Sequence, residues 1–96
     1  MILSFANTST QTGRIWTGQR SKRVPSDIQN RALAKLRMLN RARVVEDLRN
    51  PPGNKLHALK DDRAGQNAIW INDQWRICFG FKDGNAYDVE IVDYHD

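Results

Sequence analysis

The hydrophobic pattern in the first half of the chain has the period of a helix. Apolar residues recur at the spacing of one helix face, which predicts a helix over residues 27–40. Ser26 and Gln29 stand at the spacing of a capping box, so the helix is expected to begin there. The apolar face of this predicted helix consists of Ile28, Ala32, Leu36 and Leu39.

After the Pro-Pro-Gly segment at residues 50–54, the hydrophobic period changes to two, which is typical of strands. Asp83 and Gly84 both tolerate a positive φ, so they predict a tight hairpin between the last two strands. Weaker patterns predict a short strand at residues 2–5 and a short helix around residues 8–17. The strands predicted in the second half cover residues 55–59, 66–72, 75–82 and 86–92.

The predicted strand over residues 75–82 divides its side chains between two faces. Its odd-numbered residues are large and apolar, so they face the core, whereas Arg76 faces the other way. Tyr94 has the same non-core parity in the last strand, and we therefore expect Arg76 and Tyr94 on one concave face of the sheet. Asp93 and His95 have core parity but lie beyond the apolar run, near the rim of the sheet.

Length and composition favour one α+β domain over residues 1–96. The 96 residues, 40% of them hydrophobic, leave room for one sheet and two or three helices. No apolar run approaches the roughly 20 residues of a membrane span, and no signal peptide is recognisable. The only cysteine, Cys78, is consistent with a reducing cytoplasm. The histidines, cysteine and acids show no metal-ligand spacing, so no metal and no cofactor are expected.

The charge is unevenly distributed along the chain. Residues 1–43 contain nine Lys or Arg and one acid, whereas residues 44–96 contain six Lys or Arg and ten acids. This polarity favours a polyanionic partner for the first half, most simply nucleic acid. A solvated helix face would have a similar composition, so charge alone leaves both interpretations open.

Three blocks of sequence resemble one protein family. The strings PPGNKLHAL, DDRAGQNAIWINDQWRICF and the terminal VEIVDYH are similar to the HigB-type killer toxins of bacterial toxin–antitoxin operons, which belong to the RelE/ParE superfamily. The resemblance covers nearly the whole chain and is weaker in the N-terminal half. It implies a RelE-like α+β fold, with a short N-terminal strand and two helices packed on a curved, mainly antiparallel sheet.

The resemblance also implies an activity and partners. HigB-like toxins are generally ribosome-dependent mRNA endonucleases, or mRNA interferases, which cut messenger in the ribosomal A site without a metal and stop translation. The implied partners are the ribosome, mRNA and a HigA-type helix-turn-helix antitoxin. That antitoxin silences the toxin and represses the operon, so the complex would contact operator DNA. No membrane partner is implied.

Metal-free RNA cleavage needs a base for the 2′-hydroxyl proton, an acid for the leaving 5′-oxygen and cations for the phosphate. The resemblance assigns the proton transfers to the two histidines, in either order, and the phosphate to an arginine and a lysine. Asp93 would orient His95, and Tyr94 would contact phosphate or stack on a base. The alternatives without a catalytic role are a surface histidine, a solvated arginine and a frayed C-terminal tail. The predicted catalytic residues are His57, Lys60, Arg76, Asp93, Tyr94 and His95.

Other positions have more than one interpretation. Trp70 stands where the relatives commonly carry Arg, and it would stack on a base, pack in the core or contact a partner. Arg63 is expected to pair with Asp61 or Asp62, and Cys78 to be a small interior residue rather than a nucleophile. The basic residues expected to contact ribosomal RNA, with a solvated face as the alternative, are Arg20, Lys22, Arg23, Arg31, Lys35 and Arg37.

Two other functions are compatible with the superfamily. ParE-type members inhibit DNA gyrase and cleave nothing, but such an inhibitor has no use for paired proton carriers, so His57 and His95 favour the nuclease. The loss of a charge at Trp70 suggests a third possibility, a weak toxin that acts mainly in repression of its own operon.

Overall fold

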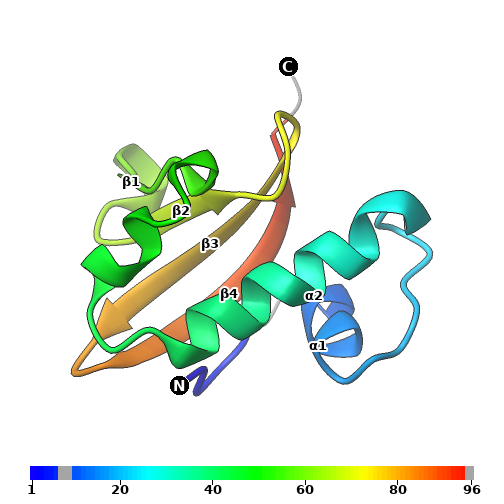
Figure 1. The fold of residues 1–96 in the computed structure, drawn as a ribbon, viewed down its shortest axis with the longest axis horizontal. Helices are drawn as coiled ribbons and strands as arrows, with labels where there is room; N and C mark the ends of the chain where they lie inside the picture. Colours follow the sequence, from blue (N-terminus) through cyan, green and yellow to red (C-terminus); the bar gives the residue numbers. More distant parts are fainter. Residues whose placement is uncertain (7–9, 95–96) are drawn as a thin grey trace.

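The structure is a computed structural model that describes residues 1–6 and 10–94. Two helices are followed by short 3-10 turns and a four-stranded sheet (Figure 1). Within the described residues, no helix is both long and apolar enough to cross a membrane. The elements are α1 (Thr10–Trp16), α2 (Ser26–Arg41), η1 (Val45–Arg49), η2 (Pro52–Asn54), β1 (His57–Ala58), η3 (Asp61–Arg63), β2 (Asn67–Trp70), β3 (Trp75–Lys82) and β4 (Asn85–Asp93).

The sheet is an antiparallel meander in the order β1-β2-β3-β4, which confirms the predicted α+β fold. The predicted N-terminal strand is reduced to two isolated parallel bridges, from Ile2 to Ala86 and from Phe5 to Val89. These bridges cover part of the outer edge of β4, which would otherwise expose unpaired backbone groups. The strand predicted at residues 55–59 is also shorter, because only two residues of β1 pair with β2.

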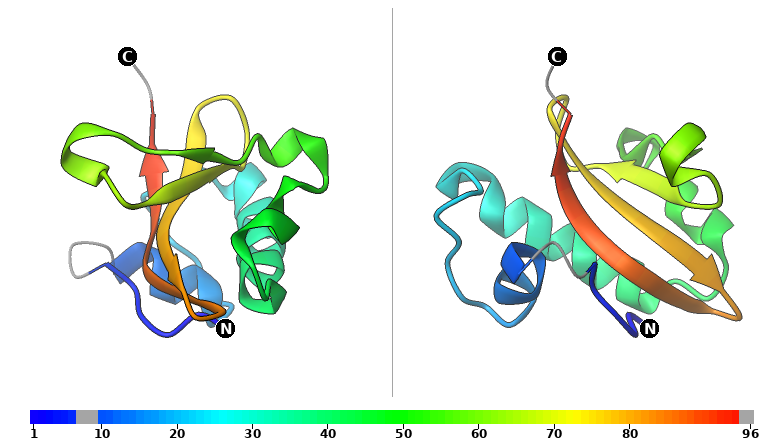
Figure 2. Two further views of the ribbon diagram at one scale, coloured as in Figure 1. Left: turned by 90° about the vertical axis from the view of Figure 1, so that its left-hand side faces the viewer. Right: turned by 180° about the vertical axis from the view of Figure 1, so that it is seen from behind.

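Helix α2 packs its apolar face against one side of the sheet (Figure 2). Leu36 is fully buried, as is Leu39. They belong to the same core as Ile69, Ile77 and Ile91, which the register aligns in one row across β2, β3 and β4. The period-of-two pattern therefore predicted the core face of β3 correctly.

The β3–β4 hairpin has the predicted turn. Asp83 and Gly84 have φ angles of 53° and 79°, as a type I′ turn requires. The register between the strands then shifts, and Asp88 adopts a φ of 52° at a β-bulge. Because of this extra residue, Ala86 before the bulge and Val89 after it are both fully buried despite their odd spacing.

The predicted capping box at the start of α2 is wrong. Pro25 occupies the N-cap, and no side chain caps the helix there. The buried amide of Gln29 instead donates to the backbone oxygens of Ser21 and Val24 and accepts from the Ser21 N–H. Gln29 therefore forms hydrogen bonds with backbone groups of the connector between α1 and α2 rather than with the helix terminus near Ser26.

A buried asparagine fixes the chain just before β1. The Asn54 side-chain amide donates to the backbone oxygens of Leu48 and Asn50, and its oxygen accepts from the ammonium of Lys35. Immediately afterwards, Lys55 adopts a left-handed backbone with a φ of 48°. This turn sets the direction in which the chain enters β1.

Candidate active site

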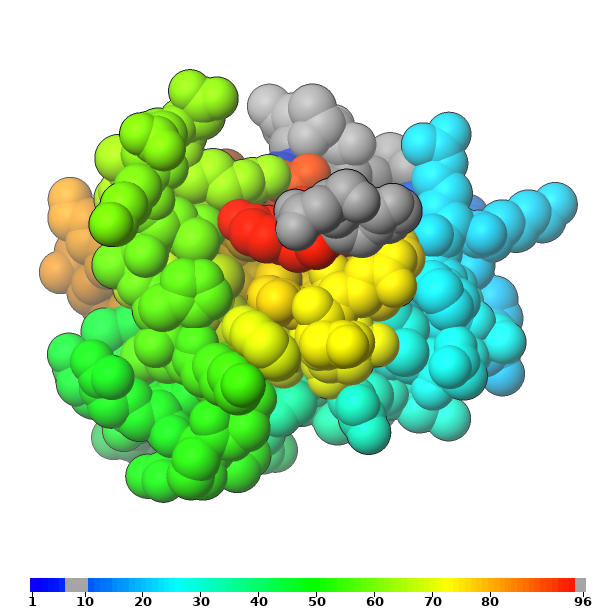
Figure 3. All heavy atoms as spheres, turned by 90° about the horizontal axis from the view of Figure 1, so that it is seen from above, coloured from blue at the N-terminus to red at the C-terminus, as the bar shows by residue number. Residues whose placement is uncertain are grey.

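The side of the sheet away from the core row carries the candidate site. Directly paired residues of an antiparallel sheet point to the same side, and alternate residues of a strand share a face. Seen from above, the region of β1, the β2–β3 turn and the C-terminal end of β4 lie side by side (Figure 3). The register places on this face His57, Ala68, Trp70, Arg76, Cys78, Glu90 and Val92.

Arg76 is the central cation of this face. Only 8% of the residue is exposed. Its Nη1 donates to the backbone oxygen of Asn72 at 2.5 Å, and its guanidinium lies 3.8 Å from the ring centroid of Trp70 and 5.5 Å from that of Tyr94. No carboxylate among the described residues forms an ion pair with it. The positive charge of Arg76 is therefore held in place and has no counter-ion among the described residues.

Tyr94 lies on the same face as Arg76, as its parity predicted. Its backbone N–H donates to the oxygen of Gln74 at 2.7 Å, and the ring lies beside the Arg76 guanidinium. Burial, together with the neighbouring thiol, raises the pKa of Tyr94, so the hydroxyl stays protonated at neutral pH. Burial also raises the pKa of the fully buried Cys78, as expected for an interior thiol rather than a nucleophile.

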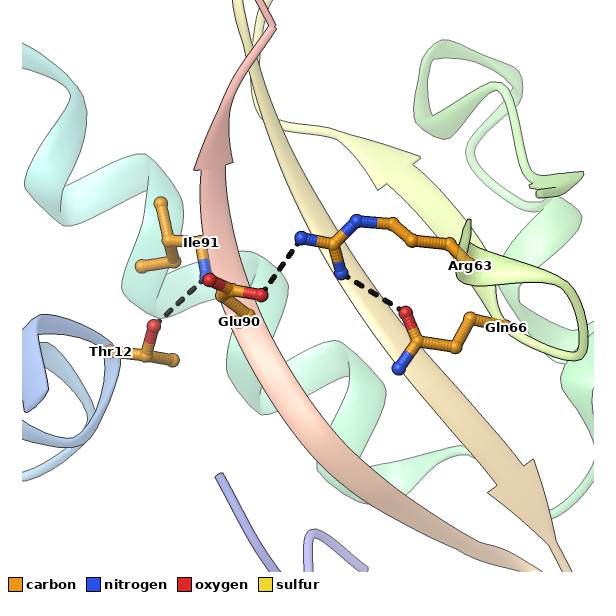
Figure 4. A network of polar contacts seen from close by, with 5 residues as sticks. All are labelled: Thr12, Arg63, Gln66, Glu90 and Ile91. Carbon is orange, nitrogen blue, oxygen red and sulfur yellow. Dashed lines mark hydrogen bonds and ion pairs between the residues drawn. The ribbon is translucent and has the colours of Figure 1, made fainter. Parts of the chain in front are cut away.

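Arg63 reaches across the sheet instead of pairing with a neighbour in its own loop. Its Nη2 lies 2.9 Å from Oε1 of Glu90 on β4, and its Nη1 donates to Oε1 of Gln66 at 3.1 Å (Figure 4). The predicted pairing with Asp61 or Asp62 is wrong, because the loop directs the long side chain over β3. The bond ties the β1–β2 loop to the same face as Arg76.

His57 is exposed on β1 with a defined ring orientation. Its Nδ1 lies 2.8 Å from the backbone oxygen of Lys55. A carbonyl oxygen only accepts hydrogen bonds, so Nδ1 carries the proton in this contact. In the neutral ring, Nε2 then retains its lone pair. This is the tautomer in which a solvent-facing nitrogen acts as a general base.

Lys55 also belongs to the site, although its sequence context did not single it out. Its ammonium lies 4.0 Å from the ring centroid of Trp70, the ring that also contacts Arg76. The only local signal is the position of Lys55 directly after the turn at Asn54. Its contact with Trp70, 15 residues later, depends on tertiary structure.

Comparison with known proteins identifies the family. Residues 11–95 match the HigB-like toxin family, described as RelE-like toxins of the type II toxin–antitoxin system HigB. The chain belongs to this family. The toxin HigB-1 of Vibrio cholerae serotype O1 is 38% identical over 68 residues, which are 71% of this chain and 72% of that protein. The endoribonuclease HigB of Proteus vulgaris is 38% identical over 72 residues, or 75% and 77% of the two chains.

Solved structures share the fold of this HigB-like toxin. A crystal structure of a YafQ mutant from E. coli superposes with a TM-score of 0.65 at 12% identity and covers 97% of this chain and 91% of its own. The YoeB–YefM complex from Staphylococcus aureus superposes with a TM-score of 0.61 at 16% identity, with coverages of 100% and 97%. Both confirm the RelE-like fold predicted for the HigB-like chain.

The remaining predicted catalytic residues of the HigB-like chain are differently placed. Asp93 is exposed and pairs in register with Trp75, so it has core parity, and its Oδ1 accepts from Nε2 of Gln74 at 3.0 Å. Lys60 is exposed in the loop between β1 and η3. His95 lies outside the described residues, and its predicted role therefore stays a prediction.

The basic residues predicted to contact ribosomal RNA divide into two groups. The first group lines a pocket of about 550 Å³ beside α1. Arg14, which the sequence pattern did not single out, belongs to it, and its Nε donates to the backbone oxygen of Arg20 at 3.3 Å. The full lining is Gln11, Arg14, Arg20, Lys22 and Arg23.

The second group lies on α2. Arg37 is exposed, and Arg31 is exposed and reaches the backbone oxygen of Ile71. Lys35 is half-buried and donates to Asn54. Burial, with a smaller contribution from Arg31, lowers the pKa of Lys35. Lys35 thus has a structural contact with Asn54, in addition to the contact with ribosomal RNA that the sequence predicted.

Proposed function

We propose that this HigB-like toxin arrests growth by cutting messenger RNA as a metal-independent endoribonuclease. The observation that carries the proposal is Arg76, a nearly buried guanidinium without a carboxylate partner among the described residues. A buried cation needs a counter-charge, and the phosphate of a bound RNA strand would supply it. The relative from Proteus vulgaris that is named an endoribonuclease supports the same class of reaction.

The proposed cleavage is an attack of the RNA 2′-oxygen on the adjacent phosphorus, and amino-acid side chains can supply the base, the acid and the positive charge that it needs. Nε2 of His57 removes the proton of the 2′-hydroxyl, and the 2′-oxygen attacks the adjacent phosphorus. The bond from phosphorus to the 5′-oxygen then breaks, and an acid protonates the departing oxygen. His95 is the proposed acid, and the two histidines exchange roles if the strand binds in the reverse sense. Arg76 stabilises the additional negative charge on the phosphate in the transition state.

The other predicted residues have supporting roles in this scheme. Lys60 adds a second positive charge near the phosphate. The hydroxyl of Tyr94 donates a hydrogen bond to a phosphate oxygen. Asp93 accepts from Gln74 at the rim of the sheet and holds the end of β4, from which His95 follows.

The ribosome and its messenger are the proposed targets, and the basic pocket beside α1 is the proposed contact with ribosomal RNA. Replacing Arg20, Lys22 and Arg23 with glutamine should reduce the magnitude of the negative slope of log affinity against log salt by about 2, because each phosphate contact contributes roughly 0.7–0.9 to it. Ribosome binding measured at several salt concentrations tests this.

A matched control replaces Arg41, Arg43 and Arg49, which are exposed and lie outside this pocket. This variant has the same change in net charge and should retain the wild-type slope. A wild-type slope in the pocket variant would mean that the pocket does not contact RNA, and an equal loss of slope in both triple variants would mean a general effect of charge.

The proposed regulatory partner is a HigA-type helix-turn-helix antitoxin. It would neutralise the toxin in the cytoplasm, and the complex of the two proteins would bind operator DNA. Membership of a toxin–antitoxin family supports an antitoxin partner. The YoeB–YefM complex is a fold relative solved together with a second protein.

Primer extension on messenger from induced cells tests the proposed activity. Discrete cuts within translated codons are expected, and they should disappear when translation is blocked before induction. DNA damage with intact messenger would instead indicate a ParE-like gyrase inhibitor. Normal growth on overexpression, with retained operator binding by the antitoxin complex, would indicate a toxin that acts mainly in autorepression.

A further inference from the structure

Trp70 brings two cations of the site together. The Arg76 guanidinium lies 3.8 Å and the Lys55 ammonium 4.0 Å from its ring centroid. The two cations are therefore no further apart than the sum of these distances. Like charges at such a separation repel each other, and the negative face of the indole offsets part of that repulsion.

The two cations come from different segments of the chain, and each is positioned by the backbone around it. Arg76 lies near the start of the inner strand β3 and donates to the oxygen of Asn72. Lys55 follows the buried Asn54 in a left-handed turn, which directs its side chain towards β2. The cations thus occupy defined positions over the indole ring.

We propose that Lys55 binds the RNA phosphate backbone and that Trp70 is the positioning residue that holds Lys55 and Arg76 as one clamp. This inference rests on the proposed endoribonuclease function. Neither cation forms an ion pair with a described carboxylate, so the pair carries two positive charges towards an anionic ligand. In this arrangement the indole ring binds the protein's own cations, and Trp70 acts on RNA through them.

The variants Trp70→Leu and Trp70→Phe distinguish the effect of the aromatic ring from the effect of side-chain volume. Leucine fills space but has no π-system, whereas phenylalanine keeps one. We expect kcat/KM for cleavage of ribosome-bound messenger to fall roughly tenfold in Trp70→Leu and to stay within about threefold of wild type in Trp70→Phe. Thermal unfolding of both variants checks that the fold is retained.

Lys55→Met removes the second cation and keeps the length of the side chain. We expect a higher KM and a salt slope whose magnitude is smaller by about 0.7, which corresponds to the loss of one phosphate contact on a single strand. Lys82→Met is the matched control, because Lys82 is exposed at the hairpin end of β3 and should leave the slope unchanged. The double variant Trp70→Leu/Lys55→Met should lose less than the product of the two single losses.

Several results would overturn the proposal while the wild-type protein still cleaves messenger. Multiplicative losses in the double variant would show that Trp70 acts independently of Lys55. Lost affinity with an unchanged salt slope in Trp70→Leu would assign the ring to a nucleobase instead. If the wild-type protein cleaves no messenger, the proposed function itself fails, and this outcome is distinct from the other two.

Discussion

Replacing Arg76 with glutamine is expected to lower the rate of messenger cleavage by about two to three orders of magnitude. The guanidinium is aligned by Asn72 and by the rings of Trp70 and Tyr94. The phosphate gains negative charge in the transition state, so its attraction to the Arg76 guanidinium would be strongest there. The low exposure of Arg76 to water strengthens this attraction further. The loss should therefore appear mainly in kcat rather than in KM, measured on ribosome-bound messenger.

The control for this variant is Arg49→Gln. Arg49 is exposed at the end of η1, outside the candidate site, so its replacement removes one positive charge without touching the site. Its kcat should equal that of the wild type. Comparable rates for Arg76→Gln and wild type, with both proteins folded by circular dichroism, would remove Arg76 from the mechanism.

Replacing Phe79 with alanine is expected to reduce the free energy of unfolding by about 3–5 kcal/mol. Phe79 is fully buried on the core face of β3, and its ring meets that of Phe81 edge to face at 6.4 Å. Because small domains are stable by only about 5–15 kcal/mol, this loss would remove a large fraction of the total stability. Urea unfolding followed by fluorescence measures the difference.

Val44→Ala provides the comparison on the surface. Val44 is 52% exposed, and its truncation should change the free energy of unfolding by no more than about 0.5 kcal/mol. A Phe79→Ala variant as stable as Val44→Ala would show that the Phe79 ring is not packed in the core on the inner face of β3.

The family resemblance predicted more of the site than the pattern of residues did. Parity alone placed Arg76 and Tyr94 on one face, and their ring contact confirms it. The predicted roles of His57 and Lys60 depend only on similarity to known toxins, and they remain predictions. Arg63 was assigned a local partner, because the sequence shows its neighbours but not the distant Glu90 that it reaches across β3.

Local periodicity in the sequence determined helix α2, the bounds of β3, its core face and the β3–β4 turn. These features depend on residues that are close in the chain, so the spacing of apolar side chains and the φ preferences of Asp83 and Gly84 suffice to predict them. Only the tertiary structure decided that Lys55 and Arg76 share the ring of Trp70, and that Gln29 serves the connector before α2. Such contacts depend on strand register and on which polar groups burial leaves without water, and both are set by the whole fold.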